Sequence, residues 1–122
     1  MRILVADDDR IIVHLVAGLL RAKGFQVIPV FDAMQVFMFA MRRPAPDAIV
    51  LDINMPGGTG VEALKRLKAS QNTALIPVIV LSGSTESGMP EKVKALGAEA
   101  FLSKPVDPGA LFAALEGALP GR

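Results

Sequence analysis

Short apolar runs alternate along the chain with stretches in which apolar side chains recur at helical spacing. The runs that predict strands are Ile3–Ala6, Phe25–Val30, Ala48–Leu51, Val78–Leu81 and Glu99–Leu102. The stretches that predict helices are Ile11–Leu20, residues 32–43, Thr59–Ser70, Pro90–Leu96 and Pro108–Leu119. Strands and helices in strict alternation predict an α/β fold, in which helices cover both faces of a five-stranded parallel sheet.

Glycine and proline residues mark the boundaries of several predicted elements. Gly24 follows the first predicted helix and Gly97 follows the fourth, where a helix commonly ends. Pro108 suits the first turn of the last helix. Pro29 lies inside the second predicted strand and has no N–H to donate, so we expect that strand at an edge of the sheet.

The size and charge of the chain exclude several functions. Its 122 residues fit a single domain, 1–122. Lys and Arg total 13 against 12 Asp and Glu, a net charge of +1 without the excess of positive charge that nucleic-acid binding requires. The absence of cysteine excludes disulfides, thiolate metal sites and cysteine nucleophiles. We therefore expect no nucleic acid among the ligands.

The apolar stretches also bear on location. The densest of them, Ile11–Leu20, is much shorter than the roughly 20 residues of a membrane-spanning helix. The N-terminus runs from Met1 to Ala6 and then into three acids, unlike a signal peptide. We expect a soluble, cytoplasmic protein with no membrane partner.

Polar residues follow four of the five predicted strands, at the edge where open α/β sheets bind their ligands. They are Asp7, Asp8 and Asp9 after the first strand, Asp52 after the third, Ser82 after the fourth and Lys104 after the fifth. Because parallel strands end at one edge of the sheet, we expect carboxylates, a hydroxyl and an ammonium to meet there.

A cluster of carboxylates has to bind a cation or take up protons. Each like-charge pair at about 4 Å costs on the order of 4 kcal/mol at an effective dielectric constant near 20. Oxygen ligands on loops favour a hard cation such as Mg²⁺, which keeps waters and a position for a phosphate oxygen. A carboxylate beside that ion can attack a phosphoryl group. Asp52, after a central strand, is the natural nucleophile.

These residues resemble the receiver domain of two-component response regulators. The matching segments are Ile3-Leu4-Val5-Ala6-Asp7-Asp8-Asp9, Ile49-Val50-Leu51-Asp52-Ile53-Asn54-Met55-Pro56, Val80-Leu81-Ser82-Gly83 and Phe101-Leu102-Ser103-Lys104-Pro105. Any one of these motifs is weak, but four in the family's order across nearly the whole chain are specific. The resemblance implies a doubly wound, flavodoxin-like sheet with strand order 2-1-3-4-5.

The resemblance also implies a role for each residue around the metal ion. Asp52 would accept the phosphoryl group, and Asp8 and Asp52 would ligate Mg²⁺ directly. The backbone carbonyl of Asn54 would be a third protein ligand, and Asp7 would act through a metal-bound water.

Further residues correspond to the family's phosphoryl contacts and switch. Lys104 would pair with the phosphoryl group, and Ser82 would donate a hydrogen bond to it on activation. Phe101 would turn inward as Ser82 moves, although a plain core position explains this phenylalanine equally well. The peptide bond before Pro105 would be cis, a form found almost only before proline.

The partners implied by the resemblance are proteins. A sensor histidine kinase or a phosphotransfer protein would supply the phosphoryl group. A downstream target would bind the face made by the fourth helix, the fifth strand and the fifth helix. The chain is most similar to stand-alone, chemotaxis-type receivers, so we expect no output domain and a monomer or weak dimer. Such a protein catalyses its own phosphorylation and is not a turnover enzyme.

The chain departs from the family's pattern near the nucleophile. Gly57-Gly58-Thr59 stands where the family often has a bulkier residue and an acid, which predicts a looser loop. Asn54 and Ser84 flank the path of an attacking water, and neither is a strong base. We therefore expect slow to moderate self-dephosphorylation.

Two other functions compete with the receiver interpretation. A small Mg²⁺-dependent phosphatase of the haloacid dehalogenase type would use Asp7 as its nucleophile. Its Asp-x-Asp-x-Thr/Val signature nearly fits Asp7–Ile11, but Ile11 breaks the last position and the chain is short for that family. A phosphorylation-independent adaptor would retain the same pocket without using it.

Structural explanations also compete at single residues. Asp9 is a favoured residue to cap the first helix, and we assign it mainly that role. His14 has no acidic partner in the sequence, so we expect a surface or partly buried structural residue and not one that takes part in phosphotransfer. The second predicted helix carries an apolar cluster that predicts core packing, with a spare exposed patch as the alternative. Its members are Met34, Phe37, Met38, Phe39 and Met41.

Overall fold

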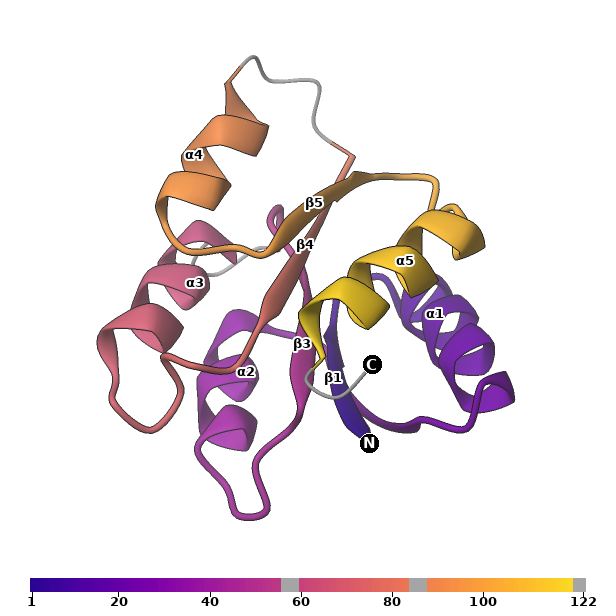
Figure 1. Ribbon diagram of the computed structural model, residues 1–122, viewed down its shortest axis with the longest axis horizontal. Coiled ribbons are helices and arrows are strands. Elements are labelled where there is room, and N and C mark those ends of the chain that lie inside the picture. The colour runs from indigo at the N-terminus through magenta and orange to yellow at the C-terminus, as the bar shows by residue number, and fades with distance from the viewer. Residues whose placement is uncertain (56–59, 84–87, 120–122) are drawn as a thin grey trace.

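A computed structural model describes residues 1–55, 60–83 and 88–119 of the chain, in which five strands alternate with five helices (Figure 1). The strands are β1 (Arg2–Ala6), β2 (Gln26–Val30), β3 (Ala48–Asp52), β4 (Val78–Ser82) and β5 (Ala100–Ser103). The helices are α1 (Arg10–Ala22), α2 (Ala33–Ala40), α3 (Gly60–Ala69), α4 (Met89–Ala95) and α5 (Pro108–Ala118).

The strands form one sheet in the order β2-β1-β3-β4-β5, and every neighbouring pair is parallel. This topology confirms the predicted doubly wound α/β fold. Pro29 pairs with Val5 on β2, which is an edge strand as predicted. β1, β3 and β4 lie inside the sheet, and every residue of β3 and β4 is buried. Their unbroken apolar runs follow from this burial on both faces.

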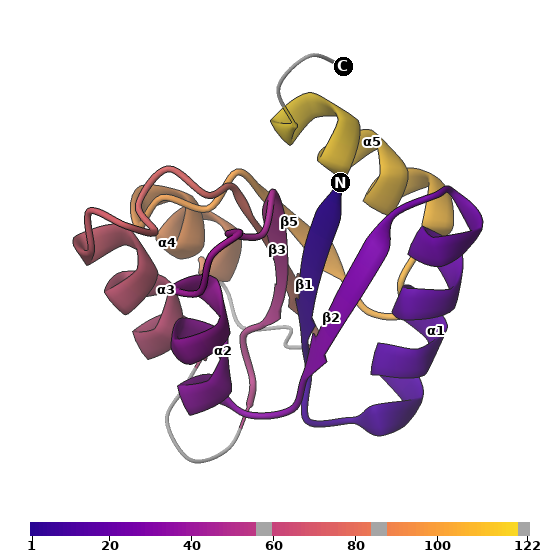
Figure 2. The same ribbon diagram turned by 90° about the horizontal axis from the view of Figure 1, so that it is seen from below.

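The helices cover the two faces of the sheet unequally. Figure 2 shows α1 and α5 on one face and α2, α3 and α4 on the other. Each face has its own buried cluster. The smaller one, beneath α1 and α5, includes Val16, Leu20 and Leu111.

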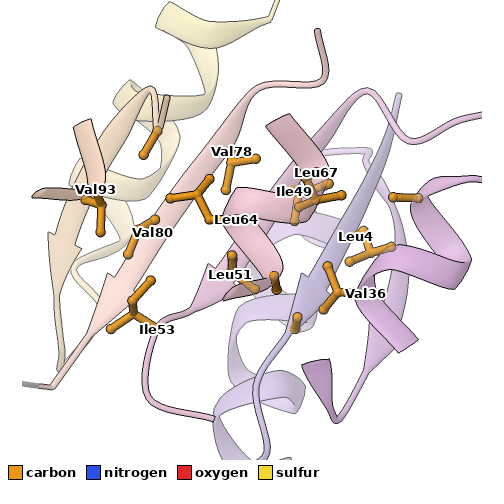
Figure 3. Packing of buried hydrophobic residues seen from close by; sticks show 14 of the residues in the cluster. Leu4, Val36, Ile49, Leu51, Ile53, Leu64, Leu67, Val78, Val80 and Val93 are labelled. Carbon is orange, nitrogen blue, oxygen red and sulfur yellow. The ribbon is translucent and has the colours of Figure 1, made fainter. Parts of the chain in front are cut away.

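The larger cluster lies between the sheet and the three helices α2, α3 and α4. Figure 3 shows its side chains, which include Leu4, Ile49, Leu51 and Val80 from the strands and Val36, Leu64, Leu67 and Val93 from the helices. These eight side chains are fully buried. Burying one side chain of this kind stabilises the fold by about 1.5–3 kcal/mol, so this packing fixes where each strand ends.

Helix boundaries follow local chemistry. Asp9 caps α1, because its Oδ1 accepts a 2.9 Å hydrogen bond from the N–H of Ile11, which confirms its predicted role. Gly24 and Gly97 have φ of +91° and +108°, left-handed values that favour glycine and that end the helices where predicted. The second helix is shorter than predicted. It begins after its cap Asp32 and ends at Ala40. Pro44 follows a few residues later and disfavours helical geometry at the residue before it.

The structure shows which apolar side chains of α1 are buried, and it corrects one expectation about those of α2. Ile11 and Leu15 belong to the predicted helical pattern of α1, yet both are exposed, and α1 turns Val13, Val16, Ala17 and Leu20 inward instead. In the α2 cluster, Phe37 and Phe39 are half-buried and pack against the core. Its methionines, Met34, Met38 and Met41, are exposed, so core packing was the wrong interpretation for them. His14 is exposed, as predicted.

In the part of the chain that the structure describes, no helix has both the length and the apolar character needed to cross a bilayer.

Candidate functional site

A cleft of about 550 Å³ opens at the carboxyl edge of the sheet. Its lining residues come from the ends of β1, β3 and β4 and from the segment after β5. They are Asp7, Asp8, Asp9, Asp52, Asn54, Gly83 and Lys104. The structure thus brings together the acids and the lysine that the sequence places after separate strands. Ser82 also lies at this edge, as the last residue of β4.

Asp52 is the last residue of β3 and is only 1% exposed. Its Oδ1 accepts a 3.0 Å hydrogen bond from the backbone N–H of Asn54. Burial raises the pKa of this carboxyl, and the negative charge of Asp7 adds to the increase. The Asn54 N–H and the Lys104 ammonium act in the opposite direction without cancelling it. Asp52 is therefore a buried carboxylate whose charge is only partly compensated.

Lys104 follows β5 and supplies that partial compensation. Its Nζ lies 2.8 Å from Oδ2 of Asp7 and 3.4 Å from Oδ1 of Asp52. Its side chain is 19% exposed, and burial alone would lower the pKa of the ammonium. Hydrogen bonding and charge from Asp7 and Asp52 outweigh this effect, so the pKa of Lys104 is raised overall. One ammonium thus holds two buried acids in place.

Three of the acids are close enough together to hold one metal ion. Carboxylate oxygens of Asp7, Asp8 and Asp52 all lie within 4.8 Å of one another. Asp7 Oδ1 accepts from the N–H of Asp9 at 2.9 Å. Its buried Oδ2 contacts the Lys104 ammonium and has no other polar partner within the described residues. An all-oxygen set with a partly unsatisfied buried oxygen fits a hard divalent cation such as Mg²⁺.

Ser82 is connected to Asp52 through Asn54. The Ser82 hydroxyl donates a 3.1 Å hydrogen bond to Oδ1 of Asn54, whose own backbone N–H binds Asp52. The carbonyl of Ser82 also accepts the backbone N–H of Lys104 at 2.9 Å. This hydrogen bond joins the end of β4 to the segment that carries Lys104.

Phe101 lies on β5, where it pairs with Val80 of β4. It is half-buried and packs against the cluster beneath α4. Its ring is therefore in contact with the core, which is compatible with both functions that the sequence left open for it. The Lys104–Pro105 peptide bond is cis, and a second cis bond precedes Pro44. Residues 57–59 and Ser84 lie outside the described part of the chain.

Gly60 is a residue that sequence reasoning missed. The backbone of α3 begins so close to β3 that a Cβ at this position would meet the carbonyl oxygen of Asp52 and the Cα of Ile53. The N–H of Gly60 donates to the carbonyl of Ile53 at 3.1 Å. Only glycine allows this approach, so Gly60 helps to fix the segment that carries Asp52. The available signal was a glycine at the start of a helix, where it is otherwise unfavourable.

The comparisons with known proteins agree with this fold and site. Residues 3–116 match the model of the response regulator receiver domain. The chain is 34% identical over 117 residues to the phosphate regulon transcriptional regulatory protein PhoB of Escherichia coli, covering 94% of this chain and 50% of PhoB. It thus spans about half the length of the first curated relatives that it matches.

Two solved structures are also similar. The chemotaxis protein CheY4 of Vibrio cholerae has a TM-score of 0.87 and 29% identity, with 97% of this chain and 98% of that chain covered. The receiver domain of the sensor histidine kinase PA1611 of Pseudomonas aeruginosa, which holds a magnesium ion in its active site cleft, has a TM-score of 0.85 and 28% identity. The coverage there is 95% of this chain and 94% of that chain.

The fold, the acidic cleft and the family match lead to one classification. The protein is of the doubly wound α/β type with an acidic site at the carboxyl edge of its sheet. Within that type, the chain belongs to the response regulator receiver domain family of two-component systems. This result confirms the resemblance inferred from the four motifs and sets aside the dehalogenase-type phosphatase.

Proposed function

We propose that this receiver domain accepts a phosphoryl group on Asp52 from a phosphohistidine of a kinase or phosphotransfer protein. The observation that carries the proposal is the position of the Asp52 carboxylate, which ends a buried strand inside an open cleft with Lys104 Nζ 3.4 Å away. In the transfer, an Asp52 oxygen attacks phosphorus while the P–N bond breaks. The bonding pair returns to the imidazole nitrogen, and the imidazole leaves as a neutral molecule because its other nitrogen carries a proton.

The residues of the chain supply most of the requirements of this reaction. Asp8, Asp52 and the carbonyl of Asn54 would hold Mg²⁺, with Asp7 acting through a water, and the bound ion would neutralise charge on the transferred group. Asp52 has to be ionised to attack. The Asn54 N–H and the Lys104 ammonium favour the ionised form against the effect of burial.

Lys104 changes partner when the phosphoryl group arrives. In the present structure its ammonium binds Asp7 and Asp52. Once Asp52 is phosphorylated, its carboxylate charge is replaced by a phosphoryl group of almost two negative charges. The nearby ammonium then pairs with a phosphoryl oxygen, where a charge-assisted hydrogen bond is strong.

Ser82 provides the second contact and connects it to the switch. Its hydroxyl leaves Oδ1 of Asn54 and donates to a phosphoryl oxygen. A shift from 1:99 to 99:1 between two states needs about 5.5 kcal/mol of differential interaction. Two hydrogen bonds to charged groups supply about 1.5–3 kcal/mol each, which is close to that requirement.

The movement is passed on to the surface that includes α4, β5 and α5. The hydrogen bond from the backbone N–H of Lys104 to the carbonyl of Ser82 couples the ends of β4 and β5. Phe101 turns inward on β5 as Ser82 moves, which changes the face that a downstream protein binds. We assign the partner-binding face to α4, β5 and α5 on this basis.

The test is intact-protein mass spectrometry after incubation with acetyl phosphate and Mg²⁺. We expect a mass increase of one phosphoryl group that Asp52→Asn abolishes. Asp32→Asn serves as the control, because Asp32 caps α2 away from the cleft and asparagine caps equally well. Absence of the adduct in the unmodified protein, together with no binding of beryllofluoride, contradicts the proposal and favours a phosphorylation-independent adaptor.

A further inference from the structure

Three methionines are exposed on one side of α2, two within the helix and one, Met41, at its C-terminal cap. Met34, Met38 and Met41 are spaced at i, i+4 and i+7, which places them on one side of the helix. Their exposed fractions are 70%, 50% and 37%. We call these three residues the methionine stripe. At 1.5 Å per residue it extends about 10 Å along the helix axis.

The methionine stripe is exposed, whereas the opposite side of α2 is buried. On the opposite side of α2, Val36 and Ala40 are fully buried, and Figure 3 shows Val36 beside Leu4. No charged residue occurs between Ala33 and Ala40. A helix that is apolar on all sides is normally buried on all sides. Methionine is enriched at surfaces that bind protein segments, because its flexible side chain adapts to the partner.

Two arginines lie over the rings of Phe37 and Phe39, the residues on either side of Met38 in the sequence. The guanidinium of Arg66, from α3, lies 4.4 Å from the ring centre of Phe37, and that of Arg42 lies 4.2 Å from the ring centre of Phe39. Both residues are exposed, and neither makes an ion pair with any residue that the structure describes. A guanidinium stacked on a ring keeps its N–H edge available, and that edge matches a carboxylate.

We propose that the methionine stripe, with Arg42 and Arg66 beside it, is a docking surface for an acidic amphipathic helix of a partner protein. Apolar residues of such a helix, repeating at i, i+3 or i+4 and i+7, would cover the three methionines. Glutamates or aspartates at the borders of its apolar face would reach the two guanidinium groups. The short length of the stripe makes the binding weak and reversible.

The charges on this face favour that partner over a second copy of the chain. Between Ala33 and Ala40, the α2 of a second copy would offer no acid to pair with Arg42 and Arg66. The stripe is also shorter than the apolar face with which amphipathic helices insert into lipid, which is commonly much longer than two turns. An acidic helix therefore satisfies both the methionines and the arginines.

This surface is separate from the phosphorylation site. α2 contributes no residue to the cleft around Asp52 among the residues described. Docking on α2 therefore differs from target binding through α4, β5 and α5, and does not depend on the phosphorylation of Asp52. The proposal stands or falls without the function proposed above.

The methionines provide their own probes. We suggest labelling the methionine methyl groups with ¹³C and titrating the whole chain with a helical peptide that carries three leucines at i, i+4 and i+7 and glutamates on both sides of them. We expect saturable shifts of the Met34, Met38 and Met41 methyl signals. Met55 and Met89 are buried and serve as internal references that stay unchanged.

Matched variants separate the stripe from general surface apolarity. Met34→Gln combined with Met38→Gln is expected to weaken peptide binding at least tenfold. Leu75→Gln removes an even more exposed apolar side chain, at 94% exposure, and is expected to leave binding unchanged. Arg42→Gln with Arg66→Gln is expected to remove the preference for this peptide over one in which lysines replace the glutamates.

Several results would overturn the proposal. Equal shifts with a scrambled peptide of the same composition would show nonspecific contact. Shifts of the stripe signals with vesicles of phosphatidylglycerol, but not with the peptide, would identify a membrane surface instead. Shifts on raising the protein concentration alone, again without a peptide response, would identify a second copy of the chain.

Discussion

The cleft and the methionine stripe differ from ordinary protein burial in opposite ways. The cleft buries charged side chains, and the stripe exposes apolar ones. In the cleft, the carboxylates of Asp7 and Asp52 are removed from water with one ammonium between them. On α2, three methionines remain in water although the helix has no charged residue. Burying charge is costly unless it is compensated, whereas exposing single apolar side chains costs the fold little. We therefore expect substitutions in the cleft to change stability strongly with pH, and substitutions in the stripe to affect binding alone.

The largest effect on stability is expected from Lys104→Met, which leaves Asp7 and Asp52 without their ammonium. Removing one partner of a buried ion pair costs several kcal/mol. Because Lys104 is partly exposed, we expect the free energy of unfolding to fall by about 2–3 kcal/mol at neutral pH. Urea denaturation over a series of pH values measures this.

The pH dependence of that loss identifies its cause. The raised pKa of Lys104 means that its contribution is fully present at neutral pH and is lost only as the pH rises through its raised pKa. As the pH falls, Asp52 protonates early because burial raises its pKa, so the deficit of the variant shrinks. Added Mg²⁺ is expected to restore part of the stability. Lys65→Met, at an exposed pair with Glu62, is the control with little effect. A deficit that is constant with pH would point to lost packing instead.

Two substitutions on α2, one buried and one exposed, test whether the methionine stripe contributes to stability. Val36→Ala removes two buried methyl groups and leaves a cavity, so we expect a loss of about 2 kcal/mol in the free energy of unfolding. Met38→Gln, two residues further on, is expected to change it by less than about 0.5 kcal/mol. Thermal or urea unfolding of both variants gives the values. A loss from Met38→Gln comparable to that from Val36→Ala would mean that the stripe stabilises the fold.

A smaller effect than that of Lys104→Met or Val36→Ala is expected from Asp52→Asn, which should raise the free energy of unfolding. Burial raises the pKa of Asp52 in the folded chain, so the carboxyl costs stability once the pH rises above its unfolded pKa. Asparagine does not titrate, so we expect a gain in the free energy of unfolding at neutral pH that vanishes in acid. Denaturation curves at neutral and acid pH measure it, with the exposed Glu116→Gln as a control. A loss of stability at neutral pH would show that Lys104 overcompensates the charge.

The sequence was most informative where one local rule determined the structure. The edge position of β2 follows from the missing N–H of Pro29, and the end of α1 follows from Gly24. The acids and Lys104 could be placed in one cleft because parallel strands end at one edge. In each of these cases the chemistry of a single residue or the topology of the sheet decides the outcome.

Other features depend on partners that lie far apart in the sequence. The hydrogen bond from Ser82 to Asn54 joins the end of β4 to the turn after β3, and the glycine at position 60 matters only because α3 begins against β3. Spacing placed Leu15 in the apolar pattern of α1, but the packing of α1 on the sheet left it exposed. Periodicity shows that a helix has an apolar side, but the tertiary packing determines which residues that side covers.

The origin of the cleft in separate strands has one more consequence. Its acids follow β1 and β3, and its lysine follows β5, so the complete set exists only in the folded chain. Any ion held there binds the native state and not the unfolded one. At a concentration one hundred times its dissociation constant, such an ion adds about 2.7 kcal/mol to the free energy of unfolding. The supply of divalent cation would thus set the lifetime of the protein against heat and proteolysis, as well as its readiness to react.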